Sequence, residues 1–337
     1  EAEAVLREGV EAEGDHLELI YGLARFYHAR GETAKADTRL AEATQADPEK
    51  PQPYLLLSAY RGRQGDLEGA LEAAEAALAA SPDNLRAKLR KAELLVDIGY
   101  RGDDSSRVAE GRAIVDAVLA GDEANPEALF VKAKIDLAER ELDAAAASLR
   151  RALEARPEWA QAHFLLGSTL LLQGDRTGAR AEVSRALELD AELLEAQRIL
   201  ARIHASLGDN ALAVETGRRV LRRSPDDVGT RILVAQSLLR LGKVDEALAE
   251  LETIPEEDRD AEAHYALGRL FSKKREWEQA RRHLMAAYDP EQPQFEVLRA
   301  LLDLDVREGR LEESAERIEA AQEAEPEDAQ LNRLWGE

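Results

Sequence analysis

Apolar residues recur along this chain in pairs of short helical patterns, and residues 160–193 show one pair clearly. Large apolar residues stand at helical spacing on both sides of a polar turn: Leu166, Leu170, Val183 and Leu187. Gly174 and Asp175 mark the turn, while Gly167 and Ala179 place a small residue in each half. The pattern predicts two amphipathic helices that cross closely at the small residues.

The same pattern returns along almost the whole chain. Glycine marks the predicted turns at a nearly constant interval, and Arg140 and Arg275 stand in the two places where it is missing. The turn glycines are Gly31, Gly65, Gly99, Gly174, Gly208, Gly242 and Gly309. The successive steps are 34, 34, 41, 34, 34, 34, 33 and 34 residues. Because one such hairpin cannot bury its apolar face alone, the spacing predicts an array of stacked copies.

The residues within this period resemble the tetratricopeptide repeat (TPR) family. Position 8 of the unit is small in eight of nine copies, and position 32 is Pro in five. The small residues are Ala24, Ser58, Ala92, Ala133, Gly167, Ala201, Ala235 and Gly268, and the prolines are Pro48, Pro82, Pro157, Pro225 and Pro326. The resemblance implies an all-α fold, a right-handed TPR superhelix (α-solenoid) of about nine helix-turn-helix repeats. It implies little about function, because TPR arrays serve many pathways.

The whole chain, residues 1–337, is predicted to be a single TPR array. Full repeats are expected at 17–50, 51–84, 85–125, 126–159, 160–193, 194–227, 228–260, 261–294 and 295–328. Residues 1–16 are interpreted as the second helix of an earlier repeat, and 329–337 as the truncated start of a further one. Neither end has the polar face of a capping repeat, so we expect further repeats or other protein beyond both ends.

Two repeats depart from the regular length. The third carries about seven extra residues near 100–106, whose Gly, Asp and Ser content predicts a solvent-exposed loop between its helices. The seventh is one residue short and contains Ile254 and Pro255, so its second helix is expected to end early.

Composition and charge narrow the classes of partner. Aromatic residues make up only 4% of the chain, which favours helices over sheets. The 68 acidic and 45 basic side chains give a net charge of −23, which argues against nucleic acid as a partner. No apolar run reaches the length of a membrane span, so no direct membrane insertion by this segment is expected. The absence of Cys fits a periplasmic or cell-envelope location and a cytoplasmic one in a bacterium equally well.

Residues that could carry chemistry are sparse. The chain contains no phosphate-binding loop, no H-E-x-x-H, no G-x-S-x-G and no EF-hand loop, so we expect no enzyme, no cofactor and no metal. His163, His204 and His264 fall on packing positions of the repeat. No two histidines lie one helical turn apart, as a paired site on one helix requires.

The TPR resemblance places positions 2, 5, 9, 12 and 13 of each first helix on a concave wall. These positions are largely apolar or aromatic in the first five repeats and rich in Arg in the later ones. The predicted partner-binding residues are Tyr21, Arg25, Leu55, Leu89, Phe130, Lys134, Phe164, Leu171, Arg198, Arg202, Arg240, Arg269, Lys273 and Arg299. Exposed apolar groups on a concave wall favour an interaction site, and guanidinium groups suit carboxylates.

Our hypothesis is a groove that holds a helical or extended protein or peptide segment, with apolar anchors toward the N-terminal half and acidic residues toward the C-terminal half. The partner is expected to cross within 160–193, where the two halves meet. In the alternative, position-5 apolar groups pack on the next repeat, while the arginines pair with acids such as Glu195, Glu262 and Glu296. The clamp with which some TPR proteins grip chaperone C-termini is not expected, because no unit has Lys at position 5 or Asn at position 6 or 9.

These features predict a non-enzymatic scaffold or adaptor that binds other proteins. The richness in Ala, Arg and Glu resembles bacterial TPR proteins, several of which serve cell-envelope assembly, polysaccharide export or secretion. One alternative is a regulatory or substrate-recruiting TPR segment of a larger enzyme, such as a glycosyltransferase or kinase. Another is an array that associates with itself through its repeat ends.

Overall fold

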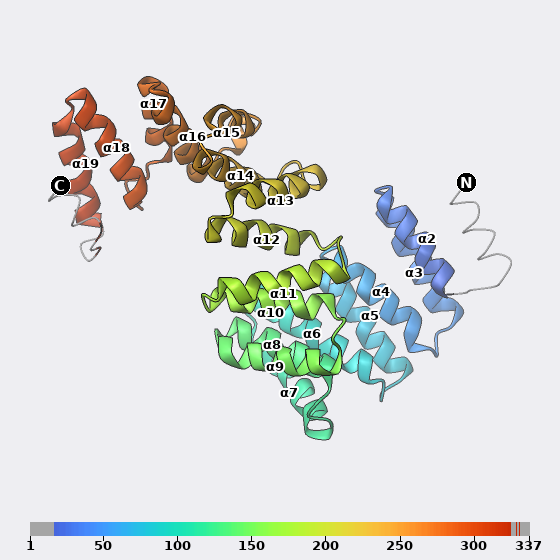
Figure 1. Ribbon diagram of the computed structural model, residues 1–337. Coiled ribbons are helices and arrows are strands. Elements are labelled where there is room, and N and C mark those ends of the chain that lie inside the picture. The colour runs from blue at the N-terminus through green and yellow to red at the C-terminus, as the bar shows by residue number, and fades with distance from the viewer. Residues whose placement is uncertain (1–16, 325–327, 329, 331–337) are drawn as a thin grey trace. The chain divides into compact units, whose positions relative to one another are not determined.

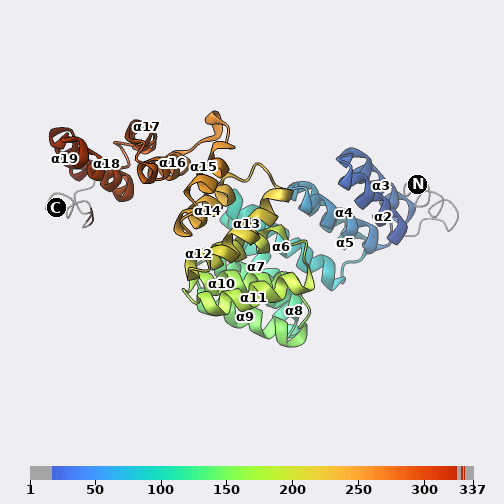
Figure 2. The same cartoon turned by 45° about the horizontal axis from the view of Figure 1, so that its top comes forward.

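The computed structural model describes residues 17–324, 328 and 330, and these contain helices but no strand. Figures 1 and 2 show the helices following one another as a series of hairpins. The expected all-α solenoid fold is therefore confirmed. The predicted partial repeats at 1–16 and 329–337 lie outside the described residues, apart from the single residue Gln330.

The chain divides into two compact units, Glu1–Gln173 and Gly174–Glu337, called unit 1 and unit 2 below. The boundary lies at the turn of the repeat predicted at 160–193. Unit 1 contains α2 (Leu17–Ala29), α3 (Thr33–Ala46), α4 (Pro51–Arg63), α5 (Leu67–Ala80), α6 (Leu85–Arg101), α7 (Ser105–Gly121), α8 (Pro126–Ala138), α9 (Leu142–Ala155) and α10 (Ala160–Leu172). Unit 2 contains α11 (Arg176–Leu189), α12 (Leu194–Leu207), α13 (Asn210–Arg223), α14 (Val228–Arg240), α15 (Val244–Glu252), the 3-10 helix η1 (Glu256–Asp258), α16 (Ala261–Lys274), α17 (Trp277–Ala287), α18 (Phe295–Glu308) and α19 (Leu311–Ala324).

The first helices of successive repeats form a layer of their own inside each unit. In unit 1, α4 contacts α6, and α6 contacts α8, in addition to the contacts between helices that follow one another. In unit 2, α12, α14, α16 and α18 contact one another in the same order. Neighbouring side chains on the exposed face of this layer come from residues about 34 positions apart in the sequence. The stacking of the repeats brings them together.

Small residues permit the close crossing of the two helices of a hairpin within each unit. Ala24 and Ala36, on α2 and α3, are completely buried. A Cβ atom built on Gly268 of α16 would lie 2.7 Å from Cγ of Leu284 on α17. One built on Gly111 of α7 would lie 2.9 Å from the carbonyl oxygen of Ala92 on α6. Both distances are shorter than carbon and oxygen contacts allow, so these crossings require glycine.

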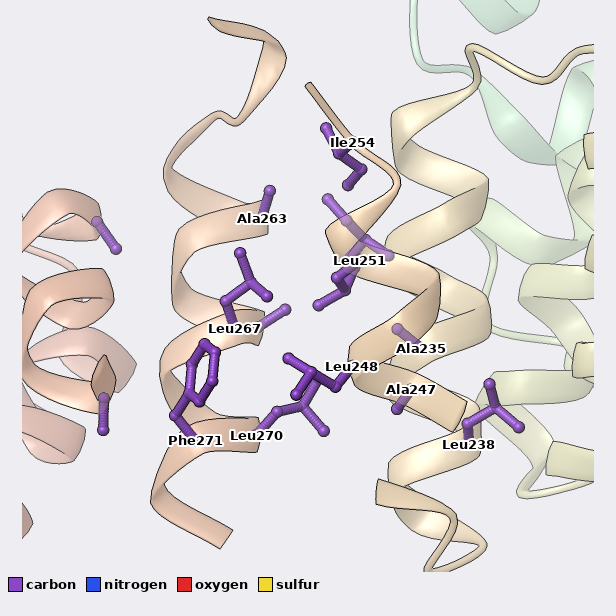
Figure 3. Packing of buried hydrophobic residues seen from close by; sticks show 14 of the residues in the cluster. Ala235, Leu238, Ala247, Leu248, Leu251, Ile254, Ala263, Leu267, Leu270 and Phe271 are labelled. Atoms are coloured by element: carbon purple, nitrogen blue, oxygen red, sulfur yellow. The ribbon is translucent and has the colours of Figure 1, made fainter. Parts of the chain in front are cut away.

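Larger apolar side chains fill the space around the crossings. Figure 3 shows this packing in unit 2, where Leu248 and Leu251 of α15 meet Leu267 and Leu270 of α16. Ile254, just after α15, is also buried in this cluster. The core of the unit is thus continuous from one repeat to the next, which is how each hairpin obtains the burial that it cannot supply alone.

The helices begin and turn where local chemistry favours it. The side chain of Asp175 accepts a hydrogen bond from the backbone N–H of Gly178 at 2.8 Å, and Asp227 caps α14 in the same way through Thr230. Six turn glycines have positive φ: Gly31, Gly65, Gly174, Gly208, Gly242 and Gly309. Arg140 and Arg275, which replace glycine in two repeats, have φ of 62° and 64°. The turn geometry is therefore retained even where a side chain makes it unfavourable.

The third repeat differs from the expectation. The extra residues form no loop across 100–106; instead α6 has 17 residues against 13 in α4, and α7 has 17 against 14 in α5. Gly99 is not a turn residue but lies buried inside α6, where an added Cβ would lie 2.6 Å from Cγ2 of Val108. The turn is confined to residues 102–104, and Asp103 takes the positive φ of 53°. The composition of the insertion favoured a loop, but packing of Gly99 against α7 extends the helices.

The two following irregularities lie in unit 2. As expected from Ile254 and Pro255, α15 has only 9 residues and ends at Glu252. In the next repeat α17 has 11 residues and ends at Ala287, and residues 288–294 have irregular structure. Pro290 and Pro293 lie in this irregular stretch, where their missing N–H groups break no helical hydrogen bond.

Two histidines that are far apart in sequence meet in unit 2. The Nδ1 atoms of His264 on α16 and His283 on α17 lie 3.0 Å apart, so one neutral imidazole donates to the other. His283 also stacks on Phe271, and its side chain is buried. The absence of histidines one turn apart on a single helix gave no hint of this pair across two helices. Burial, the neighbouring His264 and the charges of Arg259 and Arg282 lower the pKa of His283 to about 4.

The Arg275→Gly substitution is expected to raise the free energy of unfolding by about 0.5–1 kcal/mol, because it removes the left-handed strain of a side chain bearing a Cβ. The matched substitution Gly208→Ala introduces the same strain at φ 85° and should lower stability by about 1 kcal/mol. Urea unfolding followed by circular dichroism measures both. A loss of stability in Arg275→Gly would show that the arginine makes a compensating contact.

The histidine pair is expected to make the protein sensitive to acid. The folded-state pKa of His283 lies below its ordinary value of 6.5, so the unfolded chain takes up the proton first. Stability is therefore full above about pH 6.5 and declines as the pH falls toward 4, by up to about 1.4 kcal/mol per pH unit from this group. His283→Gln should show a shallower decline than wild type. Urea midpoints measured from pH 4 to pH 8 test this, and equal slopes for wild type and His283→Gln would contradict it.

Candidate binding surfaces

The first helices of unit 1 line a groove of about 1000 Å³. We call it the apolar groove. Its apolar residues come from α4, α6, α8 and the segment before α10: Leu55, Leu56, Ala59, Leu85, Leu89, Phe130, Val131 and Trp159. Its polar residues are Gln52, Arg86, Arg90, Glu93, Glu127, Arg156 and Gln161. Positions 2, 5 and 9 of neighbouring repeats thus meet on one surface.

An aromatic stack forms one wall of the apolar groove. The ring centroids of Phe130 and Trp159 lie 4.7 Å apart, and the guanidinium carbon of Arg156 lies 4.3 Å from the Trp159 ring. Arg156 is held over the ring by an ion pair with Glu127 at 2.6 Å. The indole and phenyl groups remain half-buried, so the wall has apolar area that no part of unit 1 covers. Trp159 is not among the predicted partner-binding residues, because it precedes α10 and does not stand at a concave position of a first helix.

The cations at this groove differ in how far they are already engaged. Arg90 donates to Oγ and the carbonyl oxygen of Ser58 at 3.1 Å each, and forms an ion pair with Glu93 at 2.8 Å. Arg86 is exposed and makes no ion pair with any described residue. Of the two, only Arg86 has its full set of donors available to a partner.

Lys134, a predicted groove residue, is engaged in ion pairs. Its Nζ lies 2.7 Å from Oδ1 of Asp97 and 3.2 Å from Oε1 of Glu93, both on α6. Burial raises the pKa of Glu93, but the charges of Lys134 and Arg90 outweigh it and hold the pKa below its ordinary value. Burial lowers the pKa of Lys134, but Glu93 and Asp97 raise it above its ordinary value. Lys134 therefore joins α8 to α6 rather than facing an open surface.

Unit 2 contains a second hollow, of about 590 Å³, between α16, α17 and α18. We call it the basic hollow. Its residues are Tyr265, Arg269, Ser272, Lys273, Trp277, Phe295, Glu296, Arg299, Ala300, Asp303, Leu304 and Arg307. Three of the predicted binding residues, Arg269, Lys273 and Arg299, meet here.

Several predicted residues line neither surface. Arg198 forms ion pairs with Glu195 and with Asp227, and Oδ2 of Asp227 lies 2.6 Å from Nε of Arg198. This pairing agrees with the alternative hypothesis, in which the arginines pair with nearby acidic residues. Arg240 donates to the carbonyl oxygen of Ala205 at 3.1 Å. The others are Tyr21, whose hydroxyl accepts from Arg63, the exposed Arg25 and Arg202, and the half-buried Phe164 and Leu171.

Position 5 shows both outcomes that the sequence left open. Leu89 is only 5% exposed, and Ile232 is fully buried against neighbouring repeats, so these side chains mainly pack. Leu55 and Phe130 are half-buried and line the apolar groove. The exposure of a position-5 side chain depends on how closely the next repeat packs against it. The sequence of a single repeat does not determine that distance.

The described residues contain neither a metal-binding cluster nor a membrane-spanning helix. No three His, Cys, Asp or Glu side chains within residues 17–324, 328 and 330 are grouped to hold a metal ion. Over the same residues, every helix is too short or too polar to cross a membrane.

Comparison with known families identifies the repeats. One family model described as tetratricopeptide repeat matches residues 1–60 and 204–270, and a second with the same description matches 130–193 and 173–228. Together the matches span 1–60 and 130–270, which is more than half of the 337 residues. No curated protein matches the sequence.

The chain is similar to several solved structures of TPR proteins. A thermophilic TPR protein from Thermus thermophilus is 23% identical, with a TM-score of 0.46, and the match covers 56% of this chain and 99% of that one. A tetratricopeptide repeat protein from Parabacteroides merdae is 20% identical, with a TM-score of 0.42, and the match covers 70% and 91%. YrrB, described as a TPR protein with an unusual peptide-binding site, is 17% identical, with a TM-score of 0.44 and coverage of 66% and 98%.

Lys134→Met is expected to lower the free energy of unfolding by about 2 kcal/mol, because it leaves Glu93 and Asp97 close together without their shared cation. Lys273→Met, which removes an exposed lysine without a described ion pair, should change stability by less than about 0.5 kcal/mol. Urea unfolding measures both. Unchanged stability of Lys134→Met would contradict the structural role assigned to this lysine.

Proposed function

We propose, from the premise that this chain belongs to the tetratricopeptide repeat family, that it is a non-enzymatic scaffold that binds a segment of a partner protein in the apolar groove of unit 1. TPR proteins bind protein or peptide partners, so the general role follows from the family. The choice of site is ours. The observation that carries it is the uncovered apolar wall around Phe130 and Trp159.

The apolar groove combines two properties of protein-binding surfaces. Exposed apolar area is costly unless a partner covers it, and Leu85 at the groove is 43% exposed. Aromatic and Arg side chains are enriched where binding energy concentrates, and here Trp159, Phe130 and Arg156 stack together. Because the stack is already formed in the free protein, a partner does not have to order it.

The partner chemistry follows from the lining. Apolar side chains of a helical or extended segment would cover Leu55, Leu85 and Phe130, while an acidic residue of that segment would meet Arg86. The net charge of −23 supports a protein partner over nucleic acid. We further propose a role in bacterial cell-envelope assembly, polysaccharide export or secretion, and its only support is the Ala-, Arg- and Glu-rich composition.

Affinity capture with the full chain, compared between two leucine variants, tests the site. Leu85→Asp places a charge in the apolar groove, whereas Leu172→Asp changes a leucine that is 66% exposed and outside it. We expect a partner recovered by wild type and by Leu172→Asp, and recovered at least about tenfold less by Leu85→Asp, since a charge buried against apolar atoms costs more than 1.4 kcal/mol. The captured protein also identifies the pathway.

Calorimetry with that partner then gives Kd for each variant, and circular dichroism checks that all three proteins fold alike. Equal affinities for wild type and Leu85→Asp, or equal losses in both variants, would rule out the apolar groove as the binding surface.

A further inference from the structure

The basic hollow of unit 2 collects positive charge in an acidic chain. Four cations line it, Arg269 and Lys273 on α16 and Arg299 and Arg307 on α18, and they are accompanied by two carboxylates, Glu296 and Asp303. The whole chain has 68 acidic and 45 basic side chains. Positive charge on this surface therefore runs against the average of the molecule.

None of these four cations forms an ion pair with a described residue. Neighbouring arginines in the same unit do: Arg281 on α17 lies 2.6 Å from Asp305 and 2.8 Å from Glu308. Because acidic residues are abundant in the chain, the four cations do not lack ion-pair partners for want of carboxylates. Guanidinium and ammonium groups that face one hollow without a carboxylate partner favour a ligand with several anionic groups.

Aromatic rings hold two of the guanidinium groups in place. Arg269 lies 5.7 Å from the ring centroid of Tyr265, and Arg307 lies 5.4 Å from that of Trp277. A guanidinium group that rests on a ring keeps the N–H groups at its edge available for carboxylates. Phe295 and Leu304 add half-buried and buried apolar area to the same hollow, so its lining suits anionic and apolar groups together.

The spacing of the cations along their helices favours an extended ligand. Arg299 and Arg307 are eight residues apart on α18, which corresponds to about 12 Å along the helix. Arg269 and Lys273 are one turn apart on α16. A single phosphate is too small to span the longer distance, whereas acidic side chains four positions apart in an extended peptide are about 13 Å apart.

We propose that the basic hollow is a second binding site, for an extended partner segment in which Asp or Glu alternates with apolar residues. The acidic side chains would face Arg269, Lys273, Arg299 and Arg307, while the apolar side chains between them would lie on the opposite side of the extended segment. This site lies in unit 2 and shares no residue with the apolar groove, so it does not depend on the function proposed above.

Fluorescence anisotropy with the full chain tests the site. The probe is a labelled nonapeptide in which Glu and Leu alternate, and its control has Gln in place of every Glu. At low salt we expect the Glu peptide to bind at least about tenfold more tightly than the Gln peptide, and added salt to weaken it. Lys273→Gln/Arg299→Gln should raise its Kd at least about fivefold.

Two variants serve as controls. Arg202→Gln/Arg222→Gln removes two exposed arginines of unit 2 outside the hollow, and Leu85→Asp alters only the apolar groove. Both should leave the Kd of the Glu peptide unchanged, and circular dichroism should show the same helix content in all variants. Loss of binding in Leu85→Asp would place the peptide in the apolar groove and overturn this proposal without affecting the other.

Other results would overturn it as well. Equal binding of the Glu and Gln peptides, no binding of either, or equal weakening in the two double variants would remove the charge argument. Displacement of the peptide by an equimolar amount of adenosine triphosphate would assign the hollow to small polyanions. Sedimentation showing a dimer that Lys273→Gln/Arg299→Gln converts to a monomer would make a second copy of this chain the occupant.

Discussion

The close crossing of two helices at small residues is the contact on which the rest of this structure depends. Ala36, Ala70, Ala145 and Ala213 are completely buried at these crossings, and Gly111 and Gly268 lie where a Cβ would collide with the partner helix. Once the helices approach this closely, the larger apolar side chains around them can interdigitate with the next hairpin. The close approach of the two helices therefore sets the position of every first helix and of the residues on its exposed face.

The two candidate surfaces show how an acidic array uses its cations. Many lysines and arginines join neighbouring helices, as Lys134 joins α8 to α6 and Arg281 joins α17 to α18. These ion pairs stabilise the stack but leave no donor for another molecule. Arg86 in unit 1 and Arg299 in unit 2 are different, because no carboxylate of the described residues engages them. The cations that we propose for binding therefore share two properties: they lie on the exposed face of the first helices, and no carboxylate of the described residues engages them.

How much of this could be predicted depends on the range of the interactions involved. The repeat phase, the hairpins, the early end of α15 and the left-handed turns at Arg140 and Arg275 follow from local sequence, because turn and crossing chemistry lie within about 34 residues. The pairing of Arg198 with Asp227, the meeting of His264 with His283 and the place of Trp159 beside Phe130 could not be predicted. Each of these contacts joins two helices or segments, and the distance between them depends on how the side chains of two hairpins pack together.

The lengthened hairpin of α6 and α7 shows what kind of change such an array accepts. Four added residues in one helix and three in the other amount to about one turn each, so both helices grow by one layer and Gly99 gains a contact with Val108. An insertion of two or three residues in all would leave one helix longer than its partner, with an apolar turn facing water. Length variation at the tip of these hairpins, away from the residues that line the groove, is therefore expected to occur in steps of about seven residues.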